Sequence, residues 1–353
     1  MWPQKLCGEQ EKSTEQKTHN LDVRTYMECW KDNVVKFTGV TGRCLAVSSA
    51  RSQLCMDVST PAGGFVAVQY HGPPIKARPE TLVHLHAAAK SLDVANPIHM
   101  AFCGPDPVVV VVDAGDIMTM GFQWIGCSAL GLPEQRTAQV FLLDVEKDCV
   151  VGHLMPRLGA WDDMDALQPR SVVCTPDGHR IFVTVLGQDD VRVQEFDRHS
   201  LALQRSIALG PRTRQPSLLP TWRGTFVDIC LHRQCLQVVA PRDLSDICMV
   251  SLLPEAAVVT RVDRPFAMTM LGRSSDLSAC WDASFKCITM HEVGRDGRDA
   301  WTPLAPCASL RGMHVQDTAI FVRLETGDIA VFRFTFCKTA WISACVRASL
   351  LVI

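Results

Sequence analysis

The chain has 353 residues, of which 47% are hydrophobic and 20% are charged, and its formal net charge is −2. This apolar share is large enough to fill a substantial core, which excludes a globally disordered chain. A net charge so close to zero gives no bulk attraction to nucleic acid or to an anionic membrane.

The first 31 residues are polar and mixed in charge, with little to bury. We predict that residues 1–31 form a polar tail or lead-in segment and that residues 32–353 form the folded domain. The segment lacks the apolar core of a secretory signal, and no apolar run in the chain reaches the ~18 residues that span a bilayer. These features predict an intracellular protein without a transmembrane segment, cytoplasmic by default.

Short apolar runs separated by turn-forming residues begin at Val34. The first four runs are predicted to be the strands of one unit: 34–37, 43–48, 53–59 and 65–70. The next unit is predicted over 97–124 and includes five consecutive valines, 108–112, a composition typical of a strand buried on both faces. Strands at 138–145 and 149–154 are predicted to form a third, compressed unit.

The segment 168–196 has the most informative pattern in the chain. Its first apolar strand ends at the turn Pro176-Asp177-Gly178, and further strands are predicted at 181–186 and 191–196. Two tight turns that join three alternating strands make a β-meander, which is the building unit of a propeller blade. The run 201–209 is predicted to add the outer strand.

Similar units are predicted to start near Pro216, Pro265 and Leu310, and a last β-rich segment covers 341–353. The starting points Pro169, Pro216, Pro265 and Leu310 are 47, 49 and 45 residues apart. A recurrence of this length, with several short strands in each unit, predicts an all-β fold: a β-propeller of six or seven four-stranded blades. A β-sandwich would explain the strands but not the recurrence. The lead-in segment would then be a docking segment, or would supply a strand that closes the ring near 341–353.

The unit at 168–196 resembles the NHL repeat, a propeller blade in which a Pro-Asp-Gly turn and a strand precede an Arg-Val-Gln-x-Phe strand. Here these elements are Pro176-Asp177-Gly178 and Arg192-Val193-Gln194-Glu195-Phe196. A resemblance to WD repeats is limited to Gly-His pairs such as Gly178-His179, which no Trp-Asp follows at blade spacing. The resemblance implies a propeller, a fold that serves many unrelated functions.

NHL-like propellers include metal-dependent lactonases, zinc-dependent amidating lyases and strictosidine-synthase-like enzymes, so a metal site in the central channel is one alternative. A lactonase site needs several Asn and carboxylate ligands, and this chain has only three Asn. His84 and His86 are candidate zinc ligands, because alternate positions of a strand face the same side, with His71 or His99 as a conceivable third ligand. We nevertheless expect no metal and no cofactor, because no converging catalytic set is evident.

Basic residues gather between the fourth and fifth units, and NHL-like propellers can bind RNA on a basic face. The candidate partner-binding residues are Arg205, Arg212, Arg214, Trp222 and Arg223. They suit either a protein partner or, as a second alternative, RNA.

The chain has sixteen cysteines but no Cys-x-x-Cys motif. Many lie in apolar strand-like runs, as Cys44 and Cys174 do, which predicts buried thiols in a reducing compartment. Taken together, these patterns predict a non-enzymatic protein-interaction scaffold that is a subunit of a larger assembly. The alternatives are a metal-dependent hydrolase or lyase that uses the propeller channel, and an RNA-binding protein.

Overall fold

Within the residues that it describes, the computed structural model consists of β-strands and their connections, with one 3₁₀ turn at Pro79–Thr81. No helix among the residues it describes has the length and apolar character of a membrane span. The described residues are 25–35, 44–58, 64–71, 76–86, 92, 94, 96–115, 138–155, 168–186, 190–211, 229–232, 235–239, 246–252, 257–263, 268–274, 277–282, 287–293, 299–306, 312–316, 319–324 and 329–338.

These strands form six antiparallel sheets within the described residues. The first three sheets along the chain consist of β2 (Leu45–Ser48), β3 (Gln53–Asp57), β4 (Phe65–His71), β5 (Lys76–Ala77) and β6 (Val83–Leu85); of β7 (Pro97–Phe102), β8 (Val108–Asp113), β9 (Gln139–Asp144) and β10 (Cys149–Leu154); and of β11 (Gln168–Cys174), β12 (Arg180–Leu186), β13 (Asp190–Asp197) and β14 (Leu203–Pro211).

The other three sheets contain the remaining strands. They consist of β15 (Ile229–His232), β16 (Cys235–Val239), β17 (Asp246–Leu252) and β18 (Ala257–Asp263); of β19 (Met268–Ser274), β20 (Leu277–Asp282), β21 (Cys287–Val293) and β22 (Asp299–Pro306); and of β23 (Gly312–Gln316), β24 (Ala319–Arg323), β25 (Ile329–Lys338) and β1 (Thr25–Val35).

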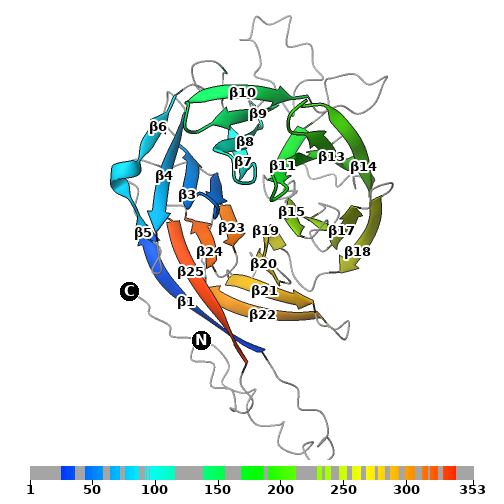
Figure 1. The fold of residues 1–353 in the computed structure, drawn as a ribbon. Coiled ribbons are helices and arrows are strands. Elements are labelled where there is room, and N and C mark those ends of the chain that lie inside the picture. The colour runs from blue at the N-terminus through cyan, green and yellow to red at the C-terminus, as the bar shows by residue number, and fades with distance from the viewer. Residues whose placement is uncertain are drawn as a thin grey trace, which may run out of the picture.

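The sheets are arranged as blades around a common centre (Figure 1). One strand of each sheet lies innermost, and it contacts the innermost strands of the two neighbouring sheets. In order around the ring these strands are β2, β7, β11, β15, β19 and β23, and β23 contacts β2 again. This closed circle confirms the predicted all-β propeller and excludes the β-sandwich, which has two layers and no radial arrangement.

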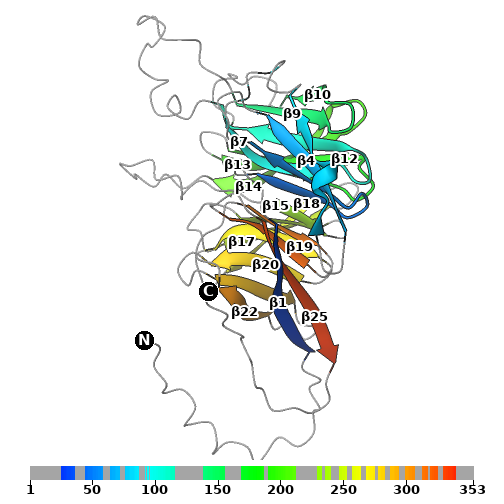
Figure 2. The same ribbon diagram turned by 90° about the vertical axis from the view of Figure 1, so that its left-hand side faces the viewer.

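The two ends of the described chain meet in one sheet. β1 pairs antiparallel with β25 from Thr25 opposite Lys338 to Val35 opposite Ile329, and the two strands lie side by side in both views (Figure 1 and Figure 2). β1 therefore begins within the predicted lead-in segment, before the boundary placed after residue 31. The prediction that 34–37 opens the first blade is wrong, because Val34 and Val35 end this closing strand. The 341–353 segment lies outside the described residues.

The interval from 97 to 154 forms one sheet rather than the two predicted units. β7 and β8 are its inner strands, and β9 and β10, which were assigned to a separate unit, are its outer strands. The connection between β8 and β9 is long, but the entropic cost of closing a loop rises only slowly with its length, so the two strands can still pair. The extra length shifts the later strands along the sequence and hides the regular spacing of the blades. The end of the unit predicted over 97–124, from residue 116 on, belongs to this connection and is outside the described residues.

The five valines of β8 show how neighbouring blades share a core. Val109 and Val111 pack with Phe65 and other buried side chains of the β2–β6 sheet. Val108, Val110 and Val112 point to the other face and pack with Ile181 and Val183 of the β11–β14 sheet. A strand inside a blade is thus covered on both faces, which is why a continuous run of valines replaces an alternating pattern.

Two glycines mark a close backbone-to-backbone junction between the β7–β10 and β11–β14 sheets. Gly104 has φ +56°, and a Cβ on it would lie 2.6 Å from the backbone N of Gly178 and 2.7 Å from the carbonyl O of Pro176. Gly178 also has a positive φ, +76°. Only glycine combines this conformation with so close an approach of two turns.

Candidate functional site

Exposed large apolar side chains are few among the described residues: Val83, Val151 and Met155, which are 49%, 42% and 68% exposed. Val83 lies on β6, Val151 lies on β10, and Met155 follows β10 directly. β6 and β10 are outer strands of two neighbouring sheets and follow one another along the rim of the ring (Figure 1). Among the residues whose exposure the structure describes, the exposed large apolar side chains therefore lie on one part of the rim.

The local structure of β10 explains this exposure. Leu154 is buried, and Gly152 is packed so closely on Leu201 of the next blade that a Cβ would overlap the Leu201 side chain. The register shifts between Val150 and Gly152, which makes Val151 the extra residue of a β-bulge. A bulge redirects side chains, so Val151 faces solvent although it lies in an apolar run.

Three histidines accompany the exposed apolar residues. His84 lies on β6, His86 follows it, and His153 lies on β10, and all three are exposed. The backbone N–H of His86 donates to the Asp148 carboxylate at 3.0 Å, which joins the end of β6 to the turn before β10. We refer to the six exposed residues as the rim patch: Val83, His84, His86, Val151, His153 and Met155.

The predicted zinc ligands His84 and His86 do lie on one side of the chain. Their rings are nearly parallel, with centroids 6.2 Å apart. His99 lies on the innermost strand β7, where its Nδ1 accepts a hydrogen bond from the backbone N–H of Val172 at 3.3 Å. Among the described residues, no group of three or more His, Cys, Asp or Glu side chains is placed to hold a metal ion.

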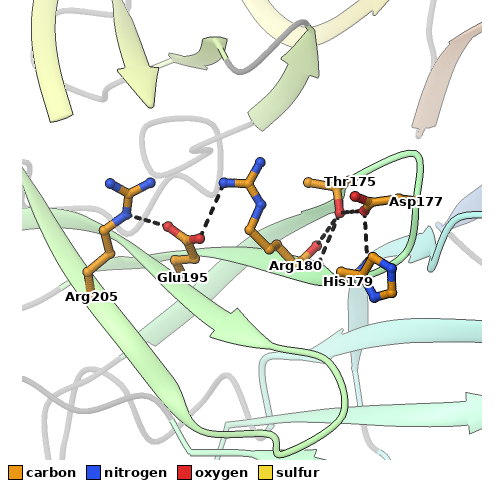
Figure 3. Close-up of polar contacts among 6 residues, drawn as sticks. All are labelled: Thr175, Asp177, His179, Arg180, Glu195 and Arg205. Carbon is orange, nitrogen blue, oxygen red and sulfur yellow. Dashed lines mark hydrogen bonds and ion pairs between the residues drawn. The ribbon is translucent and has the colours of Figure 1, made fainter. Parts of the chain in front are cut away.

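Arg205 is the one residue of the predicted basic cluster that the structure describes, because Arg212, Arg214, Trp222 and Arg223 fall in the undescribed range 212–228. The Nε of Arg205 on β14 forms an ion pair with one carboxylate oxygen of Glu195, and Arg180 Nη1 lies 3.5 Å from the other oxygen (Figure 3). The Glu195 side chain is only 7% exposed. Because a nearly buried carboxylate needs a compensating cation, the charge of Arg205 stabilises Glu195.

A second polar network fixes the turn at 176–178 (Figure 3). The Thr175 hydroxyl donates to the Asp177 carboxylate, and the backbone N–H groups of Arg180 and His179 donate to Thr175 Oγ1 and Asp177 Oδ1, each at 3.0 Å. The bond from Thr175, followed by that from His179, lowers the pKa of Asp177 below its usual value. All these hydrogen bonds join residues 175–180 to one another, so we assign the network a role in stabilising the turn and no catalytic role.

The sequence analysis did not identify two further groups, the buried Arg323 and the partly buried His314. Arg323 on β24 is fully buried and donates to the carbonyl oxygens of Cys44 and Asp57, at 3.2 Å each, across the junction with the next sheet. An arginine within the apolar run 319–324 was the signal that could have identified it. His314 lies on the innermost strand β23, where burial and then the charge of His99 lower its pKa to about 4. A single histidine in a strand gives no such signal.

No family model matches the chain, and no curated protein matches it. Among solved structures, the chain is similar to a chain in the crystal structure of the mitotic checkpoint complex, with a TM-score of 0.48, 10% identity, and coverage of 92% of this chain and 97% of that one. It is also similar to virginiamycin B lyase from Staphylococcus aureus, with a TM-score of 0.49, 9% identity, and coverage of 88% of this chain and 99% of the lyase. Likenesses this distant carry no information about activity or partners.

Proposed function

We propose that this propeller is a non-enzymatic protein-interaction scaffold, a subunit of a larger assembly that binds its partner through the rim patch. The observation that carries the proposal is the concentration of the exposed large apolar side chains of the described residues on two neighbouring outer strands. Exposed apolar side chains that lie near one another are typical of a protein interface.

The strands beneath the patch support this reading. Within the described residues, β10 pairs with β9 and β6 pairs with β4, so each strand has one paired edge and lies at the end of its sheet. An outer edge of this kind presents backbone donors and acceptors to a partner, beside the apolar side chains of Val151 and Met155. The partner we propose is a protein with a complementary apolar surface.

The finer features of the fold belong to the same proposal. We propose that the six described sheets are the complete set of blades, supported by the circle of contacts among the six innermost strands. We also propose that residues 168–196 are an NHL-like blade, supported by the turn network around Asp177. Sixteen cysteines without a Cys-x-x-Cys motif support a reducing intracellular compartment.

The test compares tagged wild-type protein with the triple variant Val83→Lys, Val151→Lys, Met155→Lys, both expressed in the native source. The matched control is Ala208→Lys, at an exposed position of the outer strand β14 on the next blade. We expect one partner to co-purify in stoichiometric amount with wild type and control, and to be lost from the triple variant while its circular dichroism and melting temperature stay unchanged. A partner that binds the triple variant as well as wild type would refute the rim patch as the binding site.

A further inference from the structure

Two cysteines from neighbouring blades are in direct contact. The Sγ atoms of Cys103, which follows β7, and Cys174, which ends β11, lie 3.3 Å apart and are joined by a hydrogen bond between the thiols. Both are reduced thiols; Cys103 is fully buried and Cys174 is 9% exposed. They adjoin the tight junction of Gly104 with Gly178, so the backbones on both sides are held in place.

The surroundings of the pair make the two thiols chemically unequal. The hydrogen bond with Cys174 lowers the pKa of Cys103, and the positive charge of Arg198 lowers it further against the effect of burial. The same hydrogen bond, followed by burial, raises the pKa of Cys174 well above its usual value. The Nε of Arg198 is buried without a hydrogen-bond partner of its own, and the Arg198 side chain favours a negative charge on Cys103 both by its charge and by a hydrogen bond.

We propose that Cys103 and Cys174 are a peroxide-reactive pair that forms a disulfide between the β7–β10 and β11–β14 blades. The Cys103 thiolate attacks the terminal oxygen of a hydroperoxide, the O–O bond breaks, and the products are Cys103 sulfenic acid and hydroxide or an alkoxide, which takes a proton from water. The Cys174 thiol then attacks the Cys103 sulfur, the S–O bond breaks, and water leaves with the thiol proton. Both thiols are oxidised together by two electrons, and the peroxide is reduced.

The geometry favours this pair over the other described cysteines. The two sulfurs need only approach from 3.3 Å to the ~2.05 Å of a disulfide, and both lie on fixed backbone. Cys55 is equally buried in a neighbouring blade, but burial and then Asp57 raise its pKa to about 12, so it remains a thiol and reacts poorly. Cys55 therefore serves as the control for oxidation of a buried thiol that has no thiol partner among the described residues. The partly exposed Cys149 serves as the control for a thiol that peroxide can reach from solvent.

The experiment treats the folded full-length protein with increasing hydrogen peroxide, blocks the remaining thiols with N-ethylmaleimide, and maps non-reduced peptides by mass spectrometry. We expect a peptide linking Cys103 to Cys174 to appear before Cys149 or Cys55 is oxidised, to disappear with dithiothreitol, and to be accompanied by a rise in the melting temperature. This assay uses the wild-type chain and does not depend on whether a variant folds.

Two variants then test the order of the steps. In Cys174→Ser, dimedone is expected to trap the sulfenic acid on Cys103, whereas Cys103→Ser is expected to leave Cys174 unlabelled at the same peroxide dose. The proposal is overturned if a dose that oxidises Cys149 in the folded protein yields no Cys103–Cys174 peptide. It is equally overturned if the linked peptide forms only in urea, or if Cys174 is labelled as fast in Cys103→Ser as Cys103 is in Cys174→Ser.

Discussion

Replacing Gly104 with alanine tests the junction between the β7–β10 and β11–β14 blades. Two separate effects are expected to destabilise the variant. An alanine held at φ +56° is strained by about 1–2 kcal/mol. Its Cβ would also lie 2.6 Å from the backbone N of Gly178 and 2.7 Å from the carbonyl O of Pro176.

Backbone atoms cannot rotate away, so the two turns must separate, and overpacking of this kind costs about 1–3 kcal/mol. We therefore expect the free energy of unfolding to fall by about 3 kcal/mol in Gly104→Ala. Gly152→Ala is the informative comparison. There the new Cβ would overlap Leu201 even more closely, but the contacting atom is the end of a flexible side chain, and no positive φ is involved.

The assay is equilibrium urea unfolding, followed by tryptophan fluorescence and by far-ultraviolet circular dichroism to check that both probes report one transition. Asp106→Ala, at an exposed position of the same turn, is the surface control and should change the free energy by less than about 0.5 kcal/mol. Equal losses in Gly104→Ala and Gly152→Ala, or a Gly104→Ala protein as stable as wild type, would show that the junction is not limited by backbone contact.

Three further predictions concern His314, Arg323 and the closing strand. The pKa of His314 is lowered to about 4 in the folded protein, whereas the unfolded chain binds this proton as the pH falls through about 6.5. The free energy of unfolding should therefore fall by at most about 3 kcal/mol between about pH 6.5 and about pH 4, and urea unfolding of His314→Gln should lack this part of the pH dependence. Arg323→Leu leaves the buried carbonyls of Cys44 and Asp57 without their donor and should cost about 2–4 kcal/mol in thermal unfolding, with partial recovery in Arg323→Lys. Deleting residues 1–35 removes β1 and exposes the edge of β25, which can then pair with another copy. Size-exclusion chromatography with light scattering should therefore show self-association. The control is deletion of residues 1–24, which retains β1 and should leave the elution volume unchanged.

The sequence predicted best those elements whose signals are local. The β11–β14 blade was predicted nearly strand by strand, because the residues that make its turn, Thr175, Asp177 and Gly178, also satisfy that turn in the structure. The sheet at 97–154 was divided wrongly because a long connection hides the register that β9 shares with β8. One of the two alternatives for the lead-in segment, a strand that closes the ring, is confirmed by β1, but its partner is β25 and not the segment 341–353. Thr25 and Lys338 are paired across nearly the whole chain, and neither residue carries a local sign of the other.

The candidate site was predictable in the same uneven way. The alternation of His84 and His86 correctly indicated a shared side, and the structure places them in the rim patch. Val151 and Met155 gave no signal, since an apolar residue in a strand is normally interpreted as core. Only the bulge and the packing of Gly152 on Leu201 determine that Val151 faces solvent. The contact of Cys103 with Cys174 depends on blade packing, which no spacing between cysteines encodes.

The pairing of Thr25 with Lys338 has a consequence for how the protein is made. Of the strands in the described residues, β1 is synthesised first and its partner β25 last. β1 therefore lacks its partner until β25 is made, while the sheets between them assemble. A premature stop before residue 329 would yield a product that can never join its two ends, however well its other blades fold.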